Sequence, residues 1–182
     1  AIISSAHIQF TADERNTGVC NLLITGEDID NSPVFATTTN NVSNRTNTTA
    51  SISWSPANWN TVGESGPDQQ TPDLKDIIQE IVNRGGYTSA SAISLIISGT
   101  GERTAESYDG VISSSAMLCI EYELPDLIWT AKDVLNKTDW FDGDNWSTGV
   151  PPISGNNVTI PTNPLGGNFF PEILSSSAEC NN

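Results

Sequence analysis

The stretch TDWFDGDNWSTGVPP, residues 138–152, concentrates residue types that can do chemistry. Its carboxylate and amide oxygens, from Asp139, Asp142, Asp144 and Asn145, are ligands that Ca²⁺ prefers. The spacing does not follow the D-x-D-x-D-G pattern of an EF-hand, and no glutamate stands at the twelfth position. The oxygen ligands alone still make Asp142 and Asp144 candidate calcium ligands. The alternative is a structural corner where a second domain begins.

Three tryptophans are candidates for carbohydrate binding, because indole rings can stack on the faces of sugars: Trp59, Trp140 and Trp146. Tryptophans in β-rich domains more often plug the end of a core. We expect the packing role, both for these three and for Trp54.

A second acidic loop, GEDIDN, supplies Glu27, Asp28 and Asp30 at the end of a strand-like run. Oxygen ligands in such a loop suit a structural calcium ion. The alternative is a turn in which aspartate and asparagine bond to the backbone. Cofactors are therefore expected to be none, or Ca²⁺ at one of these two loops.

No catalytic constellation is visible elsewhere. The segment GERTAESYDG holds paired carboxylates of the type used in glycoside hydrolysis, but we expect Arg103 to bond a carboxylate or backbone carbonyls and to brace the strands. The single histidine, His7, lies on a strand face, and the chain has no G-x-S-x-G motif. The sequence predicts a protein that is not an enzyme.

The chain of 182 residues carries 7 basic and 22 acidic side chains, a net charge of -15. Nucleic acid is excluded as a partner because phosphate binding needs a basic surface. No apolar run of about 18 residues is present, so no membrane span is expected. The Ser, Thr and Asn-rich composition predicts an extracellular protein.

The three cysteines lack the spacing of a metal site. Cys20 and Cys119 lie in strand-like runs, and an extracellular location permits a disulfide between them. Cys180 is left without a partner in this sequence.

Alternating or apolar runs separated by turn residues predict five or six short strands before residue 125, among them SSAHIQFTA, GVCNLLITGED, TASISWSP, SAISLIISG and SAMLCIEYEL. The run SAISLIISG is apolar enough for a central strand. One helix, residues 72–84, has Thr71 as its expected N-cap and Pro72 at its first position. Its apolar stripe packs on a sheet: Leu74, Ile77, Ile78, Ile81 and Val82.

This pattern predicts a mostly β fold, an antiparallel jelly-roll-like β-sandwich with one packed α-helix, in residues 1–125. Fewer strands are found than the eight or so of a jelly roll, so strands missing at its beginning are expected from elsewhere. Residues 126–182, rich in Trp, Pro, Gly and Asn, are expected to start a second β-rich domain.

Two stretches resemble known families. The segments AHIQFTADE, ITGEDIDNSPVF, NRTNTTASISWSPANWNTVGESGPDQQTPDLKDIIQEIVNR and ISGTGERTAESYDG resemble a jelly-roll-like β-sandwich repeat of large secreted and cell-surface proteins of marine and gliding bacteria. The stretch DWFDGDNWSTGVPPISGNNVTIP resembles the opening W-x5-W-x2-G and NVTIP motif of β-repeat domains in exported proteins of the Bacteroidota type.

The resemblances imply a non-catalytic structural or adhesive segment of a long bacterial surface protein, in which units of a fibre share strands. An incomplete sandwich exposes an open edge that favours strand addition. The expected partners are neighbouring segments or subunits of the same protein. The alternative function is a carbohydrate-binding module of a secreted enzyme, with glycans as partners.

Overall fold

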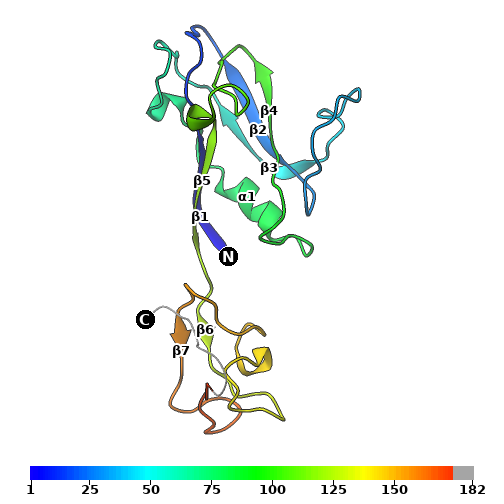
Figure 1. Cartoon of the computed structure of the whole chain (residues 1–182), viewed down its shortest axis with the longest axis vertical. Helices are drawn as coiled ribbons and strands as arrows, with labels where there is room; N and C mark the ends of the chain where they lie inside the picture. Colours follow the sequence, from blue (N-terminus) through cyan, green and yellow to red (C-terminus); the bar gives the residue numbers. More distant parts are fainter. Residues whose placement is uncertain (174–182) are drawn as a thin grey trace. The chain divides into compact units, whose positions relative to one another are not determined.

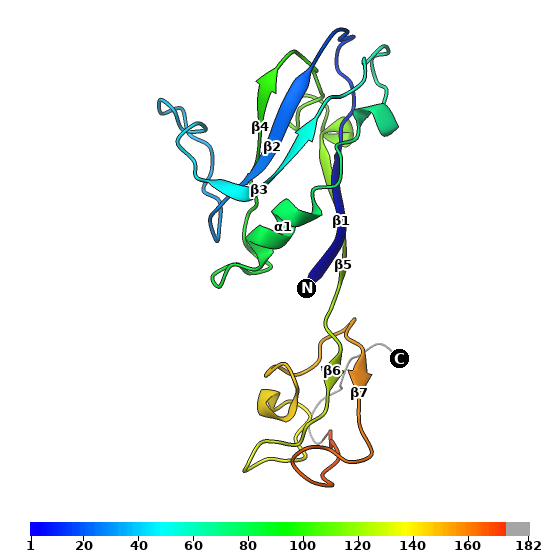
Figure 2. The same ribbon diagram turned by 180° about the vertical axis from the view of Figure 1, so that it is seen from behind.

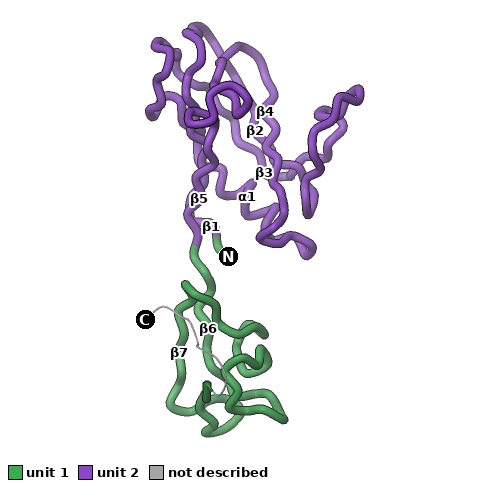
Figure 3. Tube along the Cα trace, viewed as in Figure 1, with its two compact units in different colours: residues 1–2, 123–182 green, residues 3–122 purple. Residues whose placement is uncertain are grey.

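Residues 1–173 are described by a computed structural model (Figure 1). Within them the chain is mostly β, with one α-helix, as the sequence predicts. It divides into two compact units, coloured separately in Figure 3. The first contains Ile3–Tyr122, and the second contains Ala1–Ile2 with the chain from Glu123 onward. The division lies close to Pro125, where the composition changes.

The first unit contains a three-stranded antiparallel sheet in the order β3-β2-β4. The strands are β2 (Asn21–Glu27), β3 (Asn47–Trp54) and β4 (Leu95–Thr100). The prediction of a central position for the apolar run in β4 is wrong, because β4 pairs with β2 on one side and forms an edge of the sheet (Figure 2).

A second sheet pairs β1 (Ile2–Gln9) with β5 (Met117–Glu123), and all but the end residues Ile2 and Glu123 of these strands lie in the first unit. Two short 3₁₀ turns, η1 (Pro67–Gln69) and η2 (Ile112–Ser114), lie in the connections. The antiparallel β3-β2-β4 arrangement and the helix agree with the expected β-rich class.

The helix α1 (Lys75–Val82) is shorter than expected. Thr71 does not cap it; its hydroxyl accepts a hydrogen bond from the backbone N–H of Ile8 at 3.0 Å. The N-cap position is occupied by Leu74, and Asp73 Oδ1 accepts from the Lys75 N–H at 3.0 Å. The Thr71 hydroxyl does accept a backbone N–H, as a capping residue would, but the N–H belongs to β1 and not to the helix.

The core of this unit forms where the apolar stripe of α1 meets the strands. Leu74, Ile77, Ile78 and Ile81 are almost fully buried. Gly26 in β2 allows the close approach, because a Cβ there would lie 2.6 Å from Ile81 Cδ1. Such interdigitated packing is the main source of stability in a small domain.

The second unit contains the two-stranded parallel sheet of β6 (Leu127–Ile128) and β7 (Val158–Thr159). The 3₁₀ turn η3 (Gly143–Asn145) lies between them in sequence. This unit has little regular structure, so its core depends on a few large side chains.

Candidate functional site

Three tryptophans form the centre of the second unit, the tryptophan cluster Trp129, Trp140 and Trp146. Trp146 makes edge-to-face contacts with both others, at ring-centroid distances of 5.1 Å to Trp129 and 4.9 Å to Trp140. The Trp146 Nε1 donates to the Trp140 carbonyl at 2.8 Å, and Trp129 Nε1 to that of Phe169 at 2.8 Å. The W-x5-W pattern therefore builds a core.

Burial removes these rings from consideration as sugar platforms. Trp140 is 5% exposed and Trp146 is 3% exposed. In the first unit Trp59 is 1% exposed and donates its Nε1 to the Asp68 carbonyl, while Trp54 stacks on Phe10. Carbohydrate binding, the candidate role of Trp59, Trp140 and Trp146, is corrected, because a stacking sugar needs an open ring face.

Asn145 holds the loops around the tryptophan cluster. It is completely buried, and its Nδ2 donates to the carbonyls of Asn136 at 2.7 Å and Asp139 at 3.2 Å. Its Oδ1 accepts the N–H of Asp133 at 3.1 Å, and its own carbonyl accepts that of Thr130. A buried amide with all its partners fixes loop geometry.

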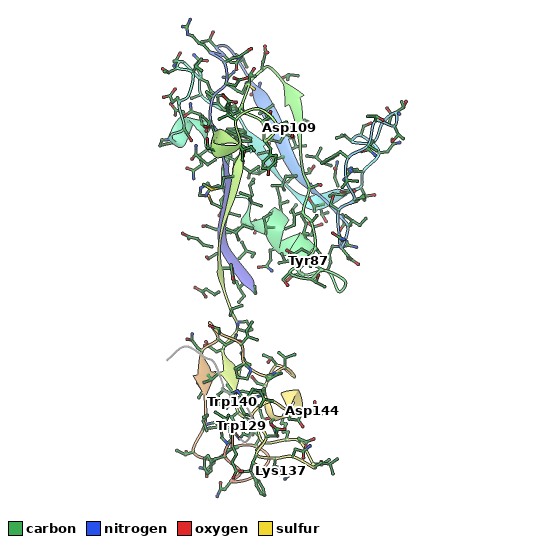
Figure 4. The ribbon with its side chains drawn as sticks, viewed as in Figure 1. Tyr87, Asp109, Trp129, Lys137, Trp140 and Asp144 are labelled. Atoms are coloured by element: carbon green, nitrogen blue, oxygen red, sulfur yellow. The ribbon has the colours of Figure 1, made fainter. Side chains whose placement is uncertain are left out.

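This scaffold brings together an acidic cluster, Asp133, Asp142 and Asp144. One carboxylate oxygen from each lies within 4.8 Å of the others. Figure 4 shows Asp144 in the same unit as Trp129 and Trp140. The sequence predicted Asp142 and Asp144; it missed Asp133, which lies nine positions before Asp142 and is brought in by its backbone bond to Asn145.

The donor set of the acidic cluster suits a hard cation that binds oxygen. None of the ion pairs formed within residues 1–173 involves these three carboxylates. Two of them also organise turns: Asp133 accepts from the N–H groups of Leu135 and Asn136, and Asp142 from that of Asp144. The cluster therefore has both a local structural role and oxygens oriented toward one another.

The other predicted metal ligands have arginine partners. Glu27 pairs with Arg45 at 2.6 Å, with both side chains more than nine-tenths buried. Asp28 and Asp30 both bond to Arg84, Asp30 through Nε at 2.6 Å. These bonds raise the pKa of Arg84, chiefly through Asp30. The prediction of calcium at Glu27, Asp28 and Asp30 is corrected, because guanidinium groups already neutralise the carboxylates.

Arg103 was expected to bond either a carboxylate or backbone carbonyls, and it bonds backbone carbonyls. Its guanidinium donates to Ala57 and Glu102 at 2.8 and 2.5 Å, and to Gly18 and Pro56 at 3.0 Å each. No ion pair joins it to the neighbouring acids within the described chain. One side chain thus ties together three separate segments of the first unit.

The predicted disulfide is not formed. Cys20, directly before β2, and Cys119, in β5 of the other sheet, are both free. Cys180 lies outside the described residues.

A hollow of about 570 Å³ in the second unit was not foreseen from the sequence. It is lined by residues 134–139 with Phe141 and Phe169. The Lys137 ammonium at its wall donates to the Gly166 carbonyl at 3.0 Å and lies 4.8 Å from the Phe169 ring centroid. The Lys137 ammonium therefore already has interaction partners within the second unit.

Comparisons with protein-family models, with curated proteins and with solved structures found no match to this chain. No helix within the described residues has the length and apolar character needed to cross a membrane.

Proposed function

We propose that this chain is a non-catalytic structural or adhesive segment of a long extracellular bacterial surface protein, whose first unit is a jelly-roll-like sandwich that assembles through strand contacts. The observation that carries the proposal is that polar side chains hydrogen-bond to the backbone of distant segments and hold those segments together. Residues of the types that do chemistry are bonded into the framework, and this is the pattern of a scaffold.

The clearest ties are formed along β1. The N–H groups of Ile3, Ala6 and Ile8 donate to the side chains of Gln79, Asp73 and Thr71, at 2.8, 3.0 and 3.0 Å. Backbone bonds alternate with them: Thr71 and Leu74 donate to the carbonyls of Ile8 and Ala6. The segment leading into α1 therefore substitutes for a neighbouring strand, and its carboxylate and amide groups are committed to that role.

The alternative, a carbohydrate-binding module, has less support. It needs exposed, coplanar aromatic rings, and the tryptophan cluster, Trp54 and Trp59 are buried. Binding to a glycan array that is abolished by substitution of an exposed aromatic such as Phe169 would revive it.

Calcium binding by the acidic cluster stays a prediction, and its role would be to stiffen the loops around Asn145. Titration calorimetry with CaCl₂ tests it, together with thermal unfolding in CaCl₂ and in EDTA. At about 100 times the dissociation constant, a bound ion stabilises the folded state by about 2.7 kcal/mol. Asp144→Asn should abolish the binding heat, whereas Asp109→Asn, an exposed acid of the other unit, should not change it.

Antibody labelling of the organism that produces the protein tests the location and the structural role. The proposal predicts labelling of intact cells, in a layer or in fibres outside the envelope. Labelling only after permeabilisation would contradict it. Turnover of a polysaccharide by the purified chain would contradict the non-catalytic part independently.

A further inference from the structure

The two sheets of the first unit have four edge strands in all. A natural β protein must protect each edge strand from pairing with other chains. In the first unit these edges are β3 and β4 of one sheet and β1 and β5 of the other. The four edges differ in the groups that reach their backbone.

Three of the four edges are protected. The outer side of β1 is bonded to residues 71–79. On β3, the Glu80 carboxylate accepts the N–H groups of Thr49 and Ala50 at 2.8 Å each. β5 carries Glu121 and Glu123, and charges on an edge strand disfavour pairing with another chain.

The outer edge of β4 has none of these protections. Its sequence, LIISGT, contains neither a charge nor a proline. The N–H of Glu27 donates to the Ser94 carbonyl, so the alternation of an antiparallel pair directs the N–H and C=O groups of Leu95, Ile97 and Gly99 away from β2. Within residues 1–173 no hydrogen bond reaches them from outside the sheet.

The inner face beside this edge is also incompletely covered. Ile97 pairs with Ile24 and shares its face of the sheet, yet Ile24 is fully buried whereas Ile97 is 41% exposed. Ile97 lines an apolar hollow of about 360 Å³ between the strands and the aromatic residues of the core. The hollow is lined chiefly by Phe10, Leu22, Trp54, Trp59, Ile97 and Ala105.

We propose that the outer edge of β4 pairs antiparallel with β4 of a second copy of this chain, which joins two three-stranded sheets into one sheet of six. The inference rests on the proposed structural function and names its contact surface. A two-fold axis perpendicular to the sheet places the inward side chains of both copies on the same face. Leu95 and Ile97 of the partner copy then cover the exposed Ile97 and the open side of the hollow.

Charge favours a second copy at this edge over the other edges. Residues 91–101 carry no charged side chain, so two copies meet there without local repulsion. The remaining opposition is the long-range repulsion between two chains of net charge -15. Salt screens that repulsion, because the Debye length falls from about 10 Å at 0.1 M to about 3 Å at 1 M. Self-association should therefore strengthen as the salt concentration rises.

Light scattering coupled to size exclusion, with the full chain over a range of concentrations and at two salt concentrations, tests the proposal. The mass of the wild-type chain should rise from 19.4 kDa toward twice that value, and more readily at high salt. Ile97→Lys, which places two charges at the pairing edge, should weaken the dimer by about tenfold or more. Ile97→Pro, which removes an outward N–H without removing a bond to β2, should do the same.

Met117→Lys is the matched control, because it makes the same change of charge at an exposed apolar residue of β5. It should leave the dimer unchanged, and thermal unfolding should show that all variants fold. A wild-type chain that stays monomeric at high salt, a dimer insensitive to Ile97→Lys, or growth beyond a dimer would overturn the two-fold pairing. Pairing of β4 with a strand of a different protein instead would also overturn it. None of these outcomes changes the result of surface labelling, which tests the proposed function separately.

Discussion

Removing the side chain of Arg45 should destabilise the first unit strongly. Arg45 and Glu27 side chains are 5% and 7% exposed, and their atoms lie 2.6 Å apart. Arg45 also donates to the carbonyls of Pro33 and Asn41 at 3.0 and 3.2 Å and lies 4.0 Å from the Phe35 ring centroid. Arg45→Met leaves the Glu27 carboxylate buried with Ser32 as its remaining partner.

The expected cost is about 3–5 kcal/mol, the range for breaking a buried ion pair by removing one partner. That is a large part of the total stability of a domain, about 5–15 kcal/mol. The double variant Glu27→Gln with Arg45→Met should cost less than the sum of the two single variants, because it removes both buried charges. Arg15→Met, at an exposed arginine, should change the stability by less than about 0.5 kcal/mol.

Urea unfolding followed by helical circular dichroism measures these values, because α1 belongs to the same unit. Arg45→Met with a cost no larger than that of Arg15→Met, or a double variant whose cost equals the sum of the single variants, would show that the buried pair is not coupled in this way. Calcium should not stabilise this unit through Glu27. An increase in its unfolding midpoint with calcium that Glu27→Gln abolishes would restore the metal interpretation.

Three further predictions concern single side chains. Hydrogen bonds from the N–H groups of Ala50 and Thr49 lower the pKa of Glu80. The stabilisation that the Glu80 carboxylate gives is therefore complete above the ordinary carboxyl pKa of about 4.3 and is lost as the pH falls below it. Glu80→Gln should lower the free energy of unfolding by about 1 kcal/mol at neutral pH and should not change it near pH 2. Urea unfolding midpoints at the two pH values measure the difference. Trp146→Ala should cost about 3–5 kcal/mol in the second unit; a smaller loss, measured by near-ultraviolet circular dichroism, would contradict its place in the core. Arg103→Lys should lower the midpoint of the first unit nearly as much as Arg103→Ala, because an ammonium cannot reach all the carbonyls; full retention by lysine would show that charge alone suffices.

Local sequence patterns predicted the structure correctly where the position of a side chain depends on its near neighbours in the chain. The apolar stripe of the helix and the alternation in β1 and β3 follow from which side chains face the core. The packing role of Trp140 and Trp146 was also expected, since large rings in a small domain are rarely left exposed.

Predictions failed where the decisive partner is distant in sequence. Thr71 has the chemistry of a cap, but the N–H of Ile8, 63 residues away, is its partner. Glu27 resembles a calcium ligand until Arg45 is placed against it. β4 has the composition of a central strand, and its edge position is a property of the sheet order.

Side chains close every edge of the first unit except β4. Amide hydrogen exchange of the whole chain at low and high protein concentration distinguishes these closed edges from the open one. We predict slow exchange at both concentrations for Ile3, Ala6 and Ile8, and protection of Ile97 that increases with concentration. Fast exchange along β1, or protection of Ile97 that is independent of concentration, would contradict the account.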